Sequence, residues 1–342
     1  MATARKTGGN EQVTTYDSAG GKDYADMGVW EGDTDTDHVT DSETDVLECY
    51  SGTHLDNVLM GGSNNDVNYF RIIKPAGTLG EDDWQGFYGV PKSDGSCVYV
   101  YRVDESLVMG TDEAYSQIQD IYCELTVPAT NFQNIMEIGE PNAAIVGCAV
   151  SAAAVSTASQ LRGYSCDTGG ANGFIIDCLA FDISDGSGGG RAVFINDNNL
   201  CIYNYTENNC DVAIYVKAGT TTSKNCVLDD TITVDGGAVH NQTTNTTGTP
   251  TYKNAAGENY MLAYNDATAK GGGTDLSGDG SYAFDDDVCG QVRSDWSIGF
   301  SEYFWGSGTG TGYNKFNGAY AHKVAKINGV ATYAIHKVNA VA

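Results

Sequence analysis

The chain has 342 residues, of which 45 are acidic and 18 are basic, so its formal net charge is −27. A charge this negative disfavours nucleic acid and anionic membranes as partners, because their phosphates would be repelled. With 43 Gly, 21 Tyr and only 5 Pro, the composition favours many turns and strands over helices. Residues 1–9 contain no apolar signal-peptide core and no run is long enough to span a membrane, so we expect folding in a cytoplasm.

The N-terminal region predicts an arm, a cap and the first strands. Residues 1–16 are polar and predict an arm with no strand of its own. Residues 20–31 predict a short helix, because Tyr24, Met27 and Trp30 recur every three residues and would form an apolar stripe. Such a helix can cover the open end of a solenoid. Residues 46–50 and 69–73 predict the strands of the first coil.

The central stretch, residues 174–234, consists of short β-branched and aromatic runs separated by Gly, Asn, Asp and Ser. Its cysteines add a longer period. Cys178, Cys201 and Cys226 are 23 and 25 residues apart, and Cys123 and Cys148 are also 25 apart. One coil of a parallel β-solenoid uses about this many residues, so we expect at least three of these cysteines to stack on one wall. A β-sandwich built from the same strands is the alternative fold.

Side-chain alternation and cysteine chemistry give two further expectations for this stretch. Ile176, Cys178 and Ala180 should share one face, with Asp177 and Leu179 on the other. The ten cysteines lie mostly in apolar runs and include no C-x-x-C pair. We therefore expect buried free thiols, with the disulfides of a secreted scaffold as the alternative, and no metal site and no cofactor. Residues 33–37, Asp-Thr-Asp-Thr-Asp, lack the Gly and Glu of a calcium loop and predict a solvated acidic loop.

Two parts of the sequence resemble the ends of right-handed parallel β-helix proteins of the pectate-lyase-like type. The opening match is Gly-Lys-Asp-Tyr-Ala-Asp-Met at 21–27, followed by a strand and Gly52-Thr53. The closing match covers 267–276 and 287–303, where Cys289 and Ser297 replace acidic residues of the family pattern. The resemblance implies an all-β solenoid body over residues 17–303 with an N-terminal capping helix. Similar chains are common among bacteriophage-encoded proteins and bacterial surface proteins, which implies a structural role.

After Glu302 the charge of the chain reverses. Residues 303–342 contain four lysines and no acidic residue, so the body carries −31 and the tail +4. A Gly-rich linker, 304–312, precedes a repeat of Lys, an apolar residue, Asn and Gly or Ala that begins at Lys315, Lys326 and Lys337. Asn-Gly between short apolar pairs is turn chemistry, so each unit is expected to be a small strand or a hairpin.

We expect this tail, residues 313–342, to anchor the protein in an assembly; folding back over its own solenoid is the alternative. The residues expected to form the anchor are Lys315, Phe316, Asn317, Lys326, Ile327, Asn328, Gly329, Val330, Lys337, Val338 and Asn339.

Four carboxylates are candidates for polysaccharide hydrolysis: Asp229, Asp230, Asp177 and Asp182. Inverting glycosidases use two such groups, one of them with a raised pKa. Adjacent strand residues point to opposite faces, which weakens Asp229 and Asp230 as a pair. In so acidic a chain neighbouring acids are expected by composition, so we expect none of the four to be catalytic.

Together these features predict a structural protein on the surface of a bacteriophage virion, a head-decoration or fibre-type subunit. Its expected partners are other copies of itself, with a trimer among the options, a capsid or fibre protein, and glycans. The main alternative is a tailspike-like enzyme, a hydrolase or lyase that degrades polysaccharide. A bacterial surface adhesin is a third possibility, which the absence of a signal peptide disfavours.

Overall fold

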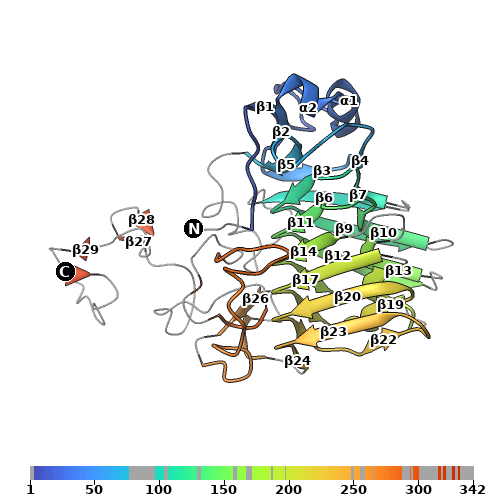
Figure 1. Ribbon diagram of the computed structural model, residues 1–342, viewed down its shortest axis with the longest axis vertical. Coiled ribbons are helices and arrows are strands. Elements are labelled where there is room, and N and C mark those ends of the chain that lie inside the picture. The colour runs from blue at the N-terminus through green and yellow to red at the C-terminus, as the bar shows by residue number, and fades with distance from the viewer. Residues whose placement is uncertain are drawn as a thin grey trace.

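Parallel strands wind into a right-handed β-helix in the computed structural model (Figure 1). This confirms the predicted solenoid and excludes the sandwich, whose face-packed sheets would be antiparallel. The structure describes residues 4–76, 97–103, 107–128, 132–156, 160–166, 172–185, 188–196, 198–247, 250–254, 259–263, 265–286, 293 and 296–299, together with four two-residue strands between 315 and 331.

Three parallel sheets form the walls, and most coils contribute one strand to each. The first sheet runs in the order β1 (Glu11–Tyr16), β2 (Thr44–Cys49), β5 (Arg71–Pro75), β8 (Gln117–Gln119), β11 (Ala144–Val146), β14 (Gly173–Ile176), β17 (Asn198–Tyr203), β20 (Gly219–Lys224) and β23 (Val239–Thr243). The second contains β3 (Gly52–His54), β6 (Val98–Val103), β9 (Tyr122–Pro128), β12 (Ala149–Ser156), β15 (Leu179–Phe181), β18 (Thr206–Asn208), β21 (Val227–Leu228) and β24 (Thr246–Thr247). The third contains β4 (Val58–Gly61), β7 (Leu107–Asp112), β10 (Phe132–Ile138), β13 (Gln160–Cys166), β16 (Arg191–Ile195), β19 (Val212–Val216) and β22 (Ile232–Val234). Residues 46–50 and 69–73, expected in one coil, instead contribute to equivalent strands of successive coils, β2 and β5.

A ladder of isoleucines fills the interior behind the first sheet. The strand register places one isoleucine directly beside the next in five successive coils, and each is at most 1% exposed: Ile73, Ile118, Ile145, Ile175 and Ile202. Identical branched side chains pack well when they repeat at the strand spacing, so each coil supports the next.

From β8 onward, a left-handed residue follows each strand of the first sheet and turns the chain into the second. Its φ lies between 51° and 67° at Asp120, Gly147, Asp177, Asn204, Asn225 and Thr244. These positions are 27, 30, 27, 21 and 19 residues apart, so the coils shorten toward the C-terminal end. Gly, Asn and Asp tolerate this conformation best. The expected alternation is therefore wrong here: Ile176 faces outward, whereas Cys178 and Ala180 face the core.

Three of the five predicted cysteines occupy one interior position beside this turn. Cys148, Cys178 and Cys226 each follow a left-handed residue, and Tyr205 takes the equivalent place between the last two. Cys201 lies instead on the outer face of the first sheet, where it pairs with Phe174. All nine cysteines in the described residues are free thiols, and all but Cys201 are buried. Cys289 lies outside those residues.

The N-terminal cap contains two short helices, α1 (Met27–Asp33) and α2 (His38–Asp41). Met27 and Trp30 are buried against the first coil, as the apolar stripe predicts. The helix begins seven residues later than expected, because the Asp26 side chain accepts hydrogen bonds from the backbone of Gly28 and Val29. The expectation of an arm without a strand is wrong, since β1 pairs in parallel with β2.

The chain then returns along the outside of the solenoid. A short antiparallel pair, β25 (Tyr252–Asn254) and β26 (Asn259–Leu262), follows the last coil. Beyond it, Leu276, Tyr282, Phe284 and Trp296 pack on the outer face of the first sheet. In Figure 1 this segment runs beside β11, β14 and β17.

Candidate functional site

The four predicted carboxylates lie at two different corners of the solenoid. Asp177 sits at the turn between the first and second sheets, before β15, whereas Asp182 follows that strand. Asp229 and Asp230 follow β21, at the same corner as Asp182 but two coils further on. The structure therefore does not bring Asp177 and Asp182 together as a pair.

Glu207 is the centre of the corner that contains Asp229 and Asp230. Its side chain is completely buried and points into the solenoid, where the neighbouring coil has Ala180. One carboxylate oxygen accepts a hydrogen bond from the backbone of Cys210 at 3.1 Å, and the other accepts from Asp229 and Asp230 at 2.9 and 3.0 Å. The sequence analysis missed this residue; its only signal was an acid in a position that is apolar in the coil before.

The environment of Glu207 changes its acidity. Burial, reinforced by the charge of Asp230 and opposed by the backbone hydrogen bond from that residue, raises the pKa of Glu207 to about 7. A raised pKa is what a general acid needs, but such a group must also reach its substrate. Glu207 has no exposed surface, and backbone N–H groups occupy both its oxygens. The arrangement holds two turns of neighbouring coils together.

We predict that Glu207→Gln flattens the pH dependence of stability. In the unfolded chain the carboxyl titrates near its ordinary pKa of 4.5, so folding takes up a proton between about pH 4.5 and 7. The stabilisation due to this group is complete below pH 4.5 and is lost as the pH rises through 7. Urea unfolding at pH 5 and pH 7 should show wild type losing about 2 kcal/mol more than Glu207→Gln, whereas the partly exposed Asp182→Asn should behave like wild type. Equal losses in wild type and Glu207→Gln would contradict this assignment.

Other acids at this corner also hold backbone in place. Asp211 accepts hydrogen bonds from the Ser184 hydroxyl at 2.9 Å and from the backbone of Asp185 and Gly190 at 3.1 and 2.8 Å. Asp230 accepts from the backbone of Cys210 at 3.0 Å. A carboxylate that accepts several hydrogen bonds fixes an irregular loop, and this role explains many of the acids in the chain.

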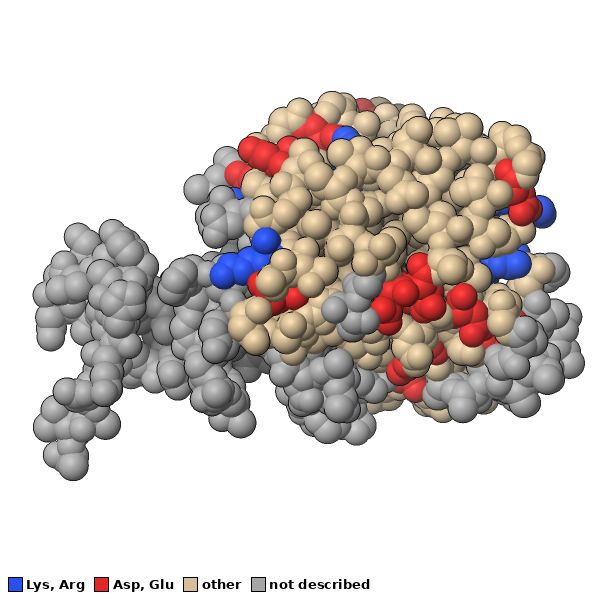
Figure 2. Space-filling view, turned by 90° about the horizontal axis from the view of Figure 1, so that it is seen from below, with Lys and Arg blue, Asp and Glu red and all other residues tan. Residues whose placement is uncertain are grey.

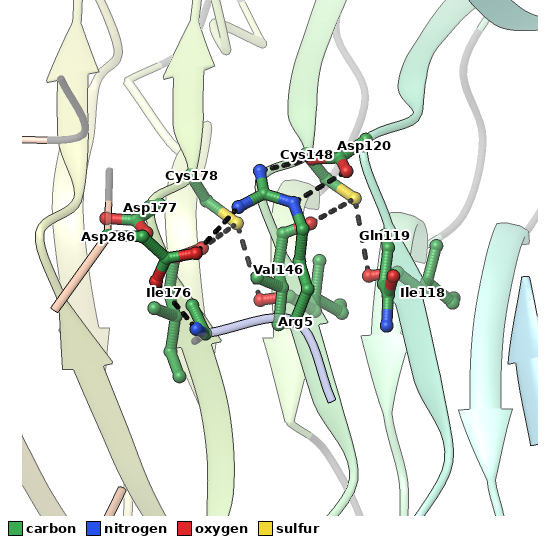
Figure 3. Close-up of polar contacts among 12 residues, drawn as sticks. Arg5, Ile118, Gln119, Asp120, Val146, Cys148, Ile176, Asp177, Cys178 and Asp286 are labelled. Carbon is green, nitrogen blue, oxygen red and sulfur yellow. Dashed lines mark hydrogen bonds and ion pairs between the residues drawn. The ribbon is translucent and has the colours of Figure 1, made fainter. Parts of the chain in front are cut away.

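A second cluster of buried charges joins both terminal segments to the solenoid (Figure 3). Arg5 makes a two-pronged ion pair with Asp120, at 2.7 and 2.5 Å, and its guanidinium is 3.7 Å from Asp286. Asp286 also accepts a hydrogen bond from the backbone of Ala4 at 2.7 Å. The N-terminal arm is thus held between a solenoid turn and the returning C-terminal segment.

Arg293 belongs to the same cluster of buried charges, which we call the clasp: Arg5, Asp120, Asp177, Asp286 and Arg293. It lies 2.9 Å from Asp177, and neither side chain is exposed. Burial, opposed by the Arg293 guanidinium, raises the pKa of Asp177 to about 8. Asp177 also accepts a hydrogen bond from Asn204 on the next coil at 3.0 Å. Its contacts therefore connect two coils with the closing segment, which is a structural role.

A row of aromatic rings crosses the outer face of the second sheet. Ring centroids are 5.4 Å apart between Tyr99 and Tyr122, 5.8 Å between Tyr122 and Phe181, and 5.2 Å between Phe181 and Tyr260. These four rings pack against one another and are at most 7% exposed, which leaves too little ring surface to stack on a sugar. Tyr252 continues the row and is partly exposed.

Two polar features of the first coil serve as local structure. Asp37 of the acidic loop caps α2 by accepting a hydrogen bond from the backbone of Thr40. The buried ring of His54 is within hydrogen-bond distance of the Ser18 hydroxyl, at 3.0 Å, and of the Tyr50 carbonyl, at 2.8 Å. In the described ranges, no group of three or more His, Cys, Asp or Glu side chains is placed to hold a metal ion.

The tail contains the two antiparallel strand pairs that the Asn-Gly repeats predict. Lys315–Phe316 (β27) pairs with Ala319–Tyr320 (β28), and Lys326–Ile327 (β29) pairs with Val330–Ala331 (β30). Two residues connect the strands in each pair, Asn and Gly in both cases. The other residues expected to anchor the protein lie outside the described residues, and they are Asn317, Asn328, Gly329, Lys337, Val338 and Asn339.

Comparison with protein-family models, with curated proteins and with solved structures finds no match to this chain. The resemblance at the two ends of the body is therefore supported at the level of the β-helix fold alone. Within the described part of the chain, neither helix is long and apolar enough to cross a membrane.

Proposed function

We propose that the protein is a non-enzymatic structural subunit of a bacteriophage virion surface, of the head-decoration or fibre type. The observation that carries this proposal is that these acidic side chains form their bonds with other parts of the protein itself. The buried Glu207 and Asp177 bond to neighbouring coils and to the closing segment, and the partly buried Asp211 fixes a loop. Such a body suits a durable, displayed particle component, and the resemblance of its two ends to bacteriophage-encoded β-helix proteins favours the virion.

The repeated tail supports attachment to a partner. Each of its two strand pairs has only two residues per strand, and an isolated two-stranded hairpin is marginal in water. Such units gain stability by adding to another surface, and their lysines favour an acidic one. We infer that the tail binds other copies of the chain or a capsid or fibre protein, on the outside of the particle.

A polysaccharide-degrading enzyme is the second candidate, and one observation favours it. Glu207, with its raised pKa, lies beside Asp229 and Asp230. Tyr252 is partly exposed, and burial together with the charges of Asp229 and Glu207 raises its pKa. Two neighbouring carboxyl groups, one of them with a raised pKa, near an aromatic ring are the parts of a glycosidase. The burial of Glu207 argues against this use.

Incubation with acidic and neutral polysaccharides tests the choice. We expect no reducing ends and no unsaturated sugars after prolonged incubation with purified protein. Release of either product, abolished by Asp229→Asn or Asp230→Asn in a variant that still folds, would replace the structural role with the enzymatic one.

A further inference from the structure

We propose that the capped end of the solenoid, residues 11–67, is the docking surface for the tail of a second copy of this chain. This inference rests on the proposed role of the tail in assembly and names the surface that receives it. The capped end comprises β1, the helices α1 and α2, and the strands and loops of the first coil, at the top of Figure 1. Three features of the capped end support this proposal: its exposed apolar side chains, the open edge of β1 and its negative charge.

Exposed apolar side chains concentrate at this end. Nine large ones are exposed in the part of the chain that the structure describes, and six of them lie in the capped end: Val13 (49%), Val29 (54%), Tyr50 (37%), Leu55 (57%), Leu59 (43%) and Val67 (71%). Single exposed apolar residues need no explanation, but a concentration on one end of a molecule indicates a contact surface. The tail offers matching groups, with Phe316, Ile327 and Val338 each following a repeat lysine.

The capped end also has an open strand edge. β1 is the outermost strand of the first sheet, and the strand it pairs with is β2. Apart from a bridge between Tyr16 and Tyr24, no described residue continues the sheet beyond β1. An extended segment can add to such an edge through backbone hydrogen bonds. The described two-residue strands of the tail form separate two-stranded pairs, which a larger sheet could extend.

The negative charge of the capped end favours the positively charged tail as the segment that binds there. Residues 11–67 contain fourteen Asp and Glu and one Lys, a net charge of −13, or nearly half the charge of the chain. None of the fourteen is buried. Within the described chain, Arg or Lys forms ion pairs with two of them, Glu31 and Glu48. The tail, with four lysines and no acid, is the complementary segment.

One contact in the capped end already shows how it can receive a lysine. The Lys22 ammonium lies 3.5 Å from the centre of the exposed Tyr50 ring. The other end of the body offers less. Figure 2 looks at that end and shows carboxylates on its surface, but among the residues described there, Val234 and Val239 are the large apolar side chains that are exposed. Docking of one copy's tail on the next copy's cap is a heterologous contact, so it builds a ring or a filament.

Three variants of the full chain test this inference: two that alter the capped end and one control. The cap variant carries Asp33→Lys, Asp35→Lys and Asp41→Lys, three exposed positions. Its matched control carries the same charge change elsewhere on the body, at Asp112, Glu140 and Asp275. A third variant, Val29→Ser with Leu55→Ser, removes apolar contacts without changing charge. Circular dichroism and urea unfolding first establish that each variant folds like wild type.

Sedimentation velocity at low salt should show wild type and the control variant assembling, and both cap variants associating at least about tenfold more weakly. The decisive sample mixes the Asp→Lys cap variant, which retains its tail, with a chain lacking residues 313–342, which retains its cap. We expect these two species, each monomeric alone, to form a 1:1 complex that cannot grow.

Three results would overturn the inference. If both cap variants assemble like wild type while the tail-deleted chain does not, the tail remains the anchor but its receptor lies elsewhere, and the proposed function survives. If the mixture stays monomeric, the tail docks on its own solenoid or on another protein. If the tail-deleted chain assembles like wild type, the inference and the assembly role of the tail both fail.

Discussion

Replacing Arg293 by alanine should cost about 3–5 kcal/mol of the free energy of unfolding, because several buried acceptors lose their donor at about 1–3 kcal/mol each. The Arg293 guanidinium is completely buried and donates hydrogen bonds to Asp177 and to the carbonyls of Asp286 and Ser297. Because Asp286 holds the N-terminal arm through Ala4 and Arg5, the loss should extend to the arm. Urea unfolding at pH 7 measures the change, and limited proteolysis should then cleave the arm and the closing segment before the coils.

Arg191→Ala is the matched control for this experiment. Arg191 is partly exposed on the outer face of the third sheet, where it donates a hydrogen bond to Gln160 and lies over the ring of Tyr215. Its loss should cost about 1 kcal/mol or less, as for most surface substitutions. If Arg293→Ala costs no more than this control, the buried clasp does not hold the terminal segments and the structural reading of Asp177 is wrong.

Deleting residues 313–342 should produce a folded β-helix that no longer assembles. The described core cluster of the solenoid is built from residues between 16 and 228, so the far-ultraviolet spectrum and the unfolding midpoint should stay close to those of the full chain. Assembly should be lost because Lys315, Lys326 and Lys337, with the apolar residue after each, are removed together. Analytical ultracentrifugation and co-sedimentation with particles measure the two effects.

A tail of unchanged composition but shuffled order serves as the control for this deletion. It keeps the +4 charge and the linker while breaking the eleven-residue repeat, so it separates general attraction between tail and body from specific docking. The shuffled tail should bind weakly, and 0.3 M salt should remove most of that binding by screening. A truncated chain that binds particles as well as the full one would reduce the tail to an end cap.

The solenoid could be predicted from the sequence because its signals are local and repeated. Strand runs, turn residues and cysteine spacing all follow from one coil length, and the Asn-Gly pairs of the tail predict hairpins by the same local chemistry. The cysteine spacing predicted the stacked wall in part by coincidence. Cys201 fits the period but lies on the outer face, because coil lengths vary from 19 to 30 residues.

The candidate sites could not be predicted in this way, because they depend on contacts between distant segments. Arg5 meets Asp120 and Asp286 across 115 and 281 positions of the chain, and nothing near Arg5 in the sequence marks these partners. Glu207 and Asp230 come together because equivalent corners of successive coils stack. Face alternation failed at Asp177 for a local reason, since one left-handed residue reverses the faces that follow.

The most direct test of the structural role is to look for the chain in bacteriophage particles. Particles purified from a host that carries this sequence would be analysed by quantitative mass spectrometry, and by electron microscopy with an antibody against the body, residues 17–303. The account predicts many copies per particle, with label on the outer surface of the head or a fibre. Absence of the chain from purified particles, or its recovery only as a free protein from the lysate, would contradict it.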